Sequence, residues 1–320
     1  DAHYVSTSLE IRYKYTLCDD WAFIIVQCHS NKAREGAGSI CYTGVPADAM
    51  AKLILRNAEV FNGESFLGPH DICIDEGQIT GINSPGTLNG GGALEYDLHG
   101  MWVIPALCDL HAHLREPGFP TKETVATGLA AAMMGGFGAV VTMPNTEPPC
   151  DSVEGLKTQL LLRDKALREA DRPLPMLIPS CAMTKGRAGK EPVDFTEVGA
   201  LAPIFTDDGS DVDDDGVLHA VMQRFMDVYS SMPEEMEHPR LMFHAQRKEM
   251  MHGGVMHLGA VSDRMCLPGI SQESEDEAVE RAIAFGLEYK VAVHITHVTT
   301  AGAVEIIQRG KQKYAQAGLA

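Results

Sequence analysis

Six short apolar runs, each followed by a helix-like segment, constrain the fold of this chain more than any other feature. They read WVIPALCDLHAH, GAVVTMPNT, PMLIPSCAMT, APIFTDDG, RLMFHAQ and VAVHITHVTT. Segments such as ETVATGLAAAMMGG and EDEAVERAIAFGLEY lie between them. Strands that are apolar along their whole length are buried on both faces, which is typical of parallel sheets covered by helices. The alternation therefore predicts an α/β fold over residues 102–320.

The residues before this region have a different pattern. MAKLILRNAEVFNG alternates like a strand, and HDICIDEGQITGI reads as a hairpin with its turn at Glu76 and Gly77. We therefore expect a small β module over residues 50–101. Residues 1–49 contain one apolar patch, WAFIIVQC, without clear periodicity, and this N-terminal extension stays unassigned.

Charge and cysteine usage exclude several classes of protein. The formal net charge of −18 argues against nucleic acid or an anionic membrane as a partner, because both reward clusters of Lys and Arg. The eight cysteines form no CxxC pair, which indicates reduced thiols and neither a disulfide framework nor a thiolate zinc site. No apolar run reaches the roughly 20 residues that span a bilayer. We expect a cytoplasmic protein.

Polar side chains gather where the apolar runs end, and this is where α/β sheets bind their ligands. In chain order they are His111, His113, Asn145, Asp207, Asp208, His244 and His297. His111 and His113 are two residues apart, so in a strand they face the same side, as a pair of metal ligands requires.

A lone His-x-His pair is more often packed or solvated than bound to metal. The single histidines at two other strand ends and the carboxylate at a third favour the metal interpretation, because imidazole nitrogen and carboxylate oxygen suit zinc. Four histidines and one bridging aspartate are enough ligands for two divalent ions. Beyond Asp208, we expect the acidic run that ends at Asp215 to be a solvated loop and helix start.

Five motifs occur in an order that resembles a known family: DLHAHLREPG, MPNTEPP, TKGRAGKE, FTDDGSDV and HITHVTT. From about residue 50 onward the chain is similar to the amidohydrolase superfamily, and within it to the dihydroorotases of the bacterial single-function type. The resemblance implies a (β/α)8-type barrel, of which about six β/α units are visible here. It implies the reversible cyclisation of N-carbamoyl-L-aspartate to L-dihydroorotate in pyrimidine biosynthesis, through a metal-bound hydroxide.

The same resemblance implies a role for each candidate metal ligand. His111 and His113 correspond to the ligands of a first metal, zinc being expected, and His244 and His297 to those of a second. Asp208 corresponds to the bridging carboxylate, because it directly precedes the glycine of the motif. The residues alone do not separate it from Asp207, and adjacent strand residues face opposite ways, so only one of the two is expected to bridge.

The resemblance also implies that Arg115 and Asn145 hold the substrate carboxylate, which suits a planar guanidinium. The alternatives are a surface ion pair of Arg115 with Glu116 or Glu123, and a plain turn role for Asn145. Lys185 is an alternative bridge only if it were carboxylated, but it follows the third run and not the fourth.

The catalytic residue stays unknown, because the family's general acid is an aspartate after the eighth strand and has no counterpart here. We interpret the chain as a fragment of a longer enzyme, since a barrel without two strands leaves open sheet edges; a catalytically dead relative is the other interpretation. Alternative functions are a related cyclic-amide hydrolase of the allantoinase or hydantoinase type, or a non-catalytic scaffold subunit. Expected partners are a small-molecule substrate and either a second copy or aspartate carbamoyltransferase.

Overall fold

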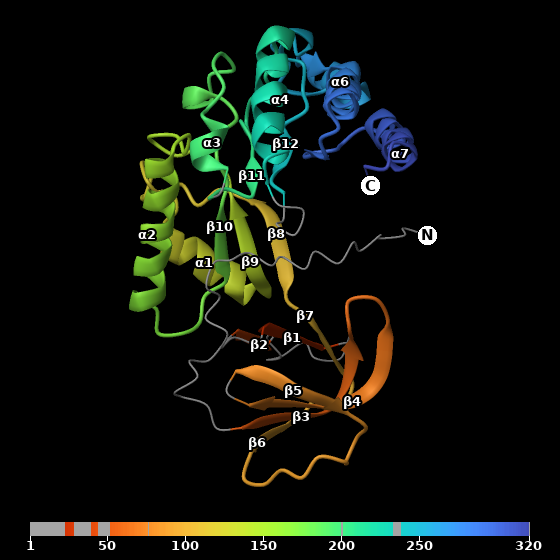
Figure 1. Cartoon of the computed structure of the whole chain (residues 1–320). Coiled ribbons are helices and arrows are strands. Elements are labelled where there is room, and N and C mark those ends of the chain that lie inside the picture. Colours follow the sequence, from red (N-terminus) through yellow and green to blue (C-terminus); the bar gives the residue numbers. More distant parts are fainter. Residues whose placement is uncertain are drawn as a thin grey trace. The chain divides into compact units, whose positions relative to one another are not determined.

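The computed structural model describes the backbone of residues 23–28, 40–43 and 52–319, except residues 76, 200 and 233–237 (Figure 1). The chain divides into two compact units. The first contains residues 1–112, 124–141 and 162–177, and the second contains residues 113–123, 142–161 and 178–320. None of the described helices is long and apolar enough to cross a membrane. The predicted boundaries after residues 49 and 101 stay a prediction.

A mixed sheet forms the N-terminal part of the first unit. Its strands have the order β2-β1-β7-β3-β4-β5, with β6 also paired to β3. They are β1 (Phe23–Cys28), β2 (Ile40–Thr43), β3 (Leu53–Phe61), β4 (Phe66–Asp75), β5 (Gln78–Asn83), β6 (Leu94–Asp97) and β7 (Met101–Pro105). β4 and β5 pair antiparallel, with Asp75 opposite Gln78, which matches the predicted hairpin; of its two turn residues, Glu76 lies outside the described residues. Alternate apolar residues such as Leu53, Leu55 and Ile72 form its core.

The first apolar run was predicted as one strand, and this is wrong. It forms two strands, β7 and β8 (Leu107–Ala112), which are separated by Ala106. β7 pairs with β1 and β3, whereas β8 belongs to a three-stranded sheet of order β10-β9-β8. The other two strands are β9 (Phe137–Thr142) and β10 (Met176–Pro179). Helices α1 (Val125–Met134) and α2 (Val153–Glu169) follow β8 and β9 along the chain, as the alternation predicts.

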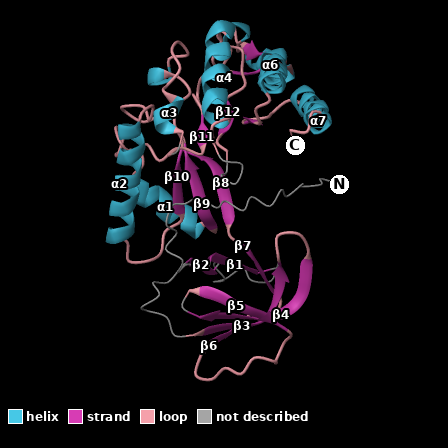
Figure 2. Ribbon diagram, in the orientation of Figure 1, coloured by secondary structure: helices cyan, strands magenta, loops and turns pink. Residues whose placement is uncertain are grey.

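The second unit contains a parallel three-stranded sheet of order β11-β12-β15. The strands are β11 (Ile204–Phe205), β12 (Arg240–Phe243) and β15 (Val293–Ile295). Helices α3 (Phe195–Val198), α4 (Asp215–Tyr229), α6 (Glu273–Tyr289) and α7 (Ala301–Gln316) accompany them (Figure 2). An insertion that the sequence did not predict separates β12 from α6: β13 (Met256–His257), α5 (Ala260–Met265) and β14 (Gly269–Ile270).

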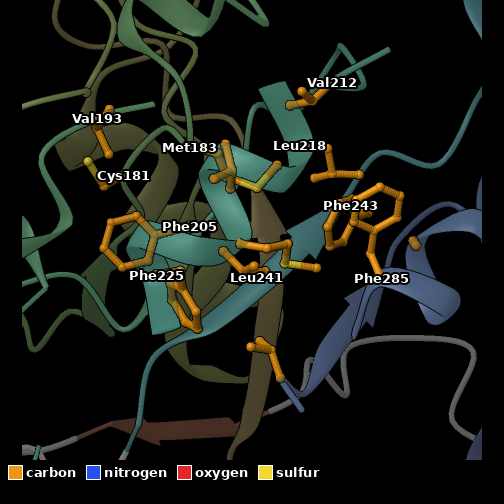
Figure 3. Packing of buried hydrophobic residues seen from close by; sticks show 14 of the residues in the cluster. Cys181, Met183, Val193, Phe205, Val212, Leu218, Phe225, Leu241, Phe243 and Phe285 are labelled. Atoms are coloured by element: carbon orange, nitrogen blue, oxygen red, sulfur yellow. The ribbon is translucent and has the colours of Figure 1, made fainter. Parts of the chain in front are cut away.

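The core of the second unit contains phenylalanine side chains among aliphatic ones (Figure 3). Phe205 of β11, Phe195 of α3 and Phe225 of α4 are all buried, and their ring centroids lie 4.9–6.0 Å apart in edge-to-face arrangements. Leu241 and Phe243 extend this cluster from β12. Because the three strands are parallel and share one core, their carboxyl ends meet at one edge of the sheet, where the predicted site residues follow.

Candidate metal centre

The Asp208 carboxylate lies among three histidines of the second unit. Its Oδ1 is 3.3 Å from His244 Nδ1 and 3.3 Å from His297 Nε2, and its Oδ2 is 3.5 Å from His113 Nε2. His244 directly follows β12, and His297 follows β15 by two residues. The Asp208 side chain is only 3% exposed. Its two oxygens thus face different histidines, which is the arrangement of a bridging ligand.

Hydrogen bonds fix the orientation of two of these imidazoles. His113 Nδ1 lies 2.9 Å from Asn145 Oδ1, which can only accept, so Nδ1 carries a proton and Nε2 is the nitrogen that faces Asp208. His244 Nδ1 accepts the Gly209 amide at 3.3 Å and lies 3.3 Å from Asp208 Oδ1. In a neutral His113, Nε2 bears a lone pair, and a nitrogen lone pair beside a carboxylate fits a bound cation.

The distances between the ligand atoms, 3.3–3.5 Å, are those that a shared divalent ion would give. Two ligand atoms about 2.1 Å from one tetrahedral zinc ion are about 3.4 Å apart. Asp208 and His297 are also among the side chains whose ligand atoms lie close enough to share an ion. Nitrogen and oxygen ligands together are those that zinc accepts.

His111 belongs to β8 in the first unit and is half-buried. It precedes His113 by two residues, and alternate residues of an extended chain face the same side. Its assignment as a metal ligand stays a prediction. His294 lies within β15, where it pairs with Met242 of β12.

The structure gives the two adjacent aspartates different surroundings. Asp207 accepts hydrogen bonds from the Met183 amide at 2.8 Å, the Thr184 amide at 3.0 Å and the Thr184 hydroxyl. Burial raises the pKa of Asp207. These donors tie the loop after β10 to the end of β11, while Asp208 faces the histidines. Lys185 forms an exposed ion pair with Glu191, with 2.5 Å between Nζ and Oε1.

Arg187 supports the turn at Asp208, and the sequence argument did not single it out. Its guanidinium donates to the backbone carbonyl of Asp208 and, at 3.4 Å, to that of Asp207. Gly209 has a φ of +83°, and a Cβ there would lie 3.2 Å from Arg187 Nη2. The turn thus requires glycine for its backbone conformation and for space. The one available signal was the position of Arg187 inside the TKGRAGKE motif.

The acidic run beyond Asp208 is not simply a solvated loop, which corrects our expectation. The Asp211 side chain is only 3% exposed and lies 3.8 Å from Arg281 of α6. Arg281 also donates to Asp215 Oδ1 at 2.7 Å and to the Val212 carbonyl at 2.8 Å. Burial raises the pKa of Asp211 to about 6. Helix α6 therefore holds the segment that follows Asp208.

The two predicted substrate-binding residues lie in loops of the second unit. Arg115 is half-buried, has a φ of +60°, and its guanidinium donates no hydrogen bond within the described part of the chain. Left-handed backbone in a residue other than glycine costs about 1–3 kcal/mol and is common at ligand-binding sites. Asn145 uses its Oδ1 for His113, which leaves the Nδ2 group as a donor.

Solved structures share this fold. An L-hydantoinase from Arthrobacter aurescens has a TM-score of 0.59 at 17% identity, over 82% of this chain and 56% of that one. A D-hydantoinase from Bacillus sp. AR9 has a TM-score of 0.58 at 19% identity, over 82% of this chain and 55% of that one. The predicted α/β fold of the amidohydrolase barrel type, with a β module before it, is therefore confirmed.

Sequence relatives define the family more narrowly. Residues 100–302 match the family model described as dihydro-orotase-like. The chain is 35% identical to a dihydroorotase of Elusimicrobium minutum over 82% of this chain and 57% of that protein. It is 35% identical to a dihydroorotase of Brevibacillus brevis, over 81% and 58%. The chain belongs to the dihydro-orotase-like family, as its motifs indicated, and spans just under three fifths of these curated relatives.

Proposed function

We propose that this protein is a dihydroorotase, which interconverts N-carbamoyl-L-aspartate and L-dihydroorotate. The observation that carries the proposal is the Asp208 carboxylate, whose two oxygens face His113 on one side and His244 and His297 on the other. The 35% identity to named dihydroorotases supports the choice of substrate over hydantoin, since the hydantoinase structures are no more than about one fifth identical.

We assign two divalent ions, with zinc as the metal, to this site. His111 and His113 would hold the first ion with Asp208 Oδ2, and His244 and His297 the second with Asp208 Oδ1. Bound divalent ions supply Lewis acidity for attack on an amide carbonyl. The chain itself orients one of these imidazoles, because Asn145 Oδ1 accepts from Nδ1 of His113.

Substrate recognition is assigned to Arg115 and Asn145. Both substrates carry a carboxylate, which a guanidinium binds with two parallel hydrogen bonds. The Nδ2 group of Asn145 adds a third donor on a residue that also orients His113. Asn145 would thus link the position of the substrate to the orientation of a metal ligand.

The proposed setting is the cytoplasm, where the reaction serves pyrimidine biosynthesis with a small-molecule substrate. Assembly as a homo-oligomer or with aspartate carbamoyltransferase stays a prediction.

The proposal is tested by metal analysis and by substrate preference. We expect the purified protein to contain divalent metal and to bind dihydroorotate in preference to hydantoin and allantoin. Asp208→Ala should lose the metal, whereas Asp263→Ala, a matched change at an exposed aspartate of α5, should retain it. A protein without divalent metal, or one that prefers hydantoin or allantoin, contradicts the proposal.

A further inference from the structure

The first turn of α6 contains a buried carboxylate that the proposed chemistry does not use. Glu275 is 9% exposed, and its Oε1 accepts the amides of Thr299 at 2.7 Å and Thr300 at 3.1 Å. Its Oε2 accepts the Thr299 hydroxyl. A buried carboxylate is costly unless it is hydrogen-bonded, and hydrogen bonds to a charged acceptor are stronger than neutral ones. Glu275 therefore ties the start of α6 firmly to the loop that leads into α7.

That loop begins with His297, which faces Asp208. His297 has a φ of +56°, in the left-handed region that costs about 1–3 kcal/mol for residues other than glycine. Such a backbone persists only where the surrounding structure determines it. On one side of His297, Thr296 donates its amide and its hydroxyl to the Phe243 carbonyl, at 3.0 and 2.9 Å. On the other side, the contacts of Glu275 begin two residues later.

The same helical turn also holds the loop of His244. The Arg247 amide donates to the Ser274 carbonyl at 2.8 Å, and Ser274 is itself buried. Residues Ser274 and Glu275 thus contact the chain three residues after His244 and two residues after His297. These loops are 53 residues apart in sequence, and one turn of α6 fixes both.

We infer that Glu275 is a positioning residue that holds His297 in its metal-binding orientation at Asp208. The inference rests on the proposed metal site and adds a residue that touches neither metal nor substrate. Glu275 acts on the backbone of Thr299 and Thr300, and through it on the left-handed conformation of His297. Loss of this support lets the His297 imidazole move away from Asp208. The affinity of His244 and His297 for their shared ion then falls.

The test measures binding of Co²⁺ to the metal-free full chain by its visible absorption. Glu275→Leu removes both acceptor oxygens, and we expect the affinity to fall about 10- to 100-fold, with an altered spectrum, as for other supports of metal ligands. Glu275→Gln keeps one oxygen for the two amides and should restore most of the affinity. Glu273→Leu, at an exposed position in the same first turn, should match the unmodified protein.

Hydrogen exchange in the metal-free protein supplies a readout independent of metal. Glu275→Leu should accelerate exchange at the Thr299 and Thr300 amides and leave the Phe205 and Leu241 amides unchanged. If Glu275→Leu does not fold, Thr299→Val, which removes only the hydroxyl donor, replaces it, with an expected loss of about tenfold in Co²⁺ affinity.

Unchanged Co²⁺ affinity in the folded variant overturns the inference, whether or not exchange is faster, because Glu275 would then support the fold alone. Binding of Co²⁺ to the unmodified protein distinguishes failure of the metal site from failure of the positioning role of Glu275. If it binds no Co²⁺, the proposed metal function fails, whereas normal binding with an insensitive Glu275 variant overturns only the positioning role.

Discussion

Asn145 has two polar ends with separable roles. Its Oδ1 accepts from His113, and its Nδ2 is available to a substrate carboxylate. Asn145→Asp keeps the acceptor and replaces the donor with a negative charge. We expect this variant to bind zinc as tightly as the unmodified protein, while the Kd for dihydroorotate rises more than about tenfold, since a hydrogen bond to a charged group is worth roughly 1.5–3 kcal/mol.

Titrations of the same preparation with dihydroorotate and with zinc check this separation. Asn145→Leu is the companion variant, because it loses both ends and should weaken zinc binding as well. Loss of zinc from Asn145→Asp would show that the contact with His113 does not orient that ligand.

Asp211 makes the stability of the protein depend on pH. Burial raises its pKa from 3.8 to about 6, against the attraction of Arg281 and Arg247 and with Asp213 opposing ionisation. The folded state therefore holds a proton that the unfolded chain releases near pH 4. Stability falls as the pH rises from about 4 to about 6, by at most about 3 kcal/mol, and this contribution is constant above that range.

Urea denaturation at pH 4.5 and 7.5 measures this effect against Asp211→Asn, which cannot ionise. The stability of the unmodified protein relative to the variant should be lower at pH 7.5. An equal difference at both pH values would show that Asp211 is ionised throughout.

Candidate ligands were predictable at the residue level because their motifs end apolar runs, but their supports were not. Asp207 and Asp208 are neighbours of one type, and their contacts in the structure distinguish them: Asp207 accepts from Met183 and Thr184, whereas Asp208 faces histidines. In the sequence, Glu275 resembles any acidic residue in the first turn of a helix, where a negative charge interacts favourably with the helix dipole. Its partners lie 24 and 25 residues further along the chain, so no local pattern reveals them.

At the level of elements, the sequence predicted those segments whose apolar residues are buried. The β13–α5–β14 insertion escaped prediction because its apolar side chains are largely exposed, among them Val255, Leu258 and Met265. Exposed apolar residues follow neither the helical nor the strand period. The division of the first run into β7 and β8 also escaped, although Pro105, which cannot donate a backbone hydrogen bond, ends β7 at the break.

The aromatic contact of α4 with β11 should dominate the stability of the second unit. Phe225 is fully buried against Phe195 and Phe205. Phe225→Ala should lower the free energy of unfolding by about 3–5 kcal/mol. Chemical denaturation measures the loss, and Leu161→Ala, at a side chain that is 66% exposed, should change it little. A loss below about 1 kcal/mol would contradict this account of the core.

For the whole molecule, the metal should contribute to stability as well as to chemistry. An ion that binds only the folded state stabilises it by about 4 kcal/mol when free metal stands at 1,000 times its Kd. Treatment with EDTA should therefore lower the midpoint of thermal unfolding, and added zinc should restore it. Asp208→Ala should show no response to EDTA, and an equal response in both proteins would place the bound metal elsewhere.

The organisation of the whole chain was the level least accessible to sequence. The chain passes from one unit to the other after residues 112, 123, 141, 161 and 177. As a result, β9, α2 and β10 each have residues in both units. The sequence pattern changes near residue 101, whereas both units contain several separate segments of the chain. The predicted domain boundaries therefore stay a prediction.

The separation of the ligands along the chain has a consequence for folding kinetics. Asp208 is 36 residues from His244 and 89 residues from His297, and the three meet only when β11, β12 and β15 lie side by side. Contacts of such high sequence separation form late, because loop closure must precede them. Zinc binding during refolding should therefore follow the pairing of β11, β12 and β15. The rate of zinc binding should then report the rate at which this sheet is completed.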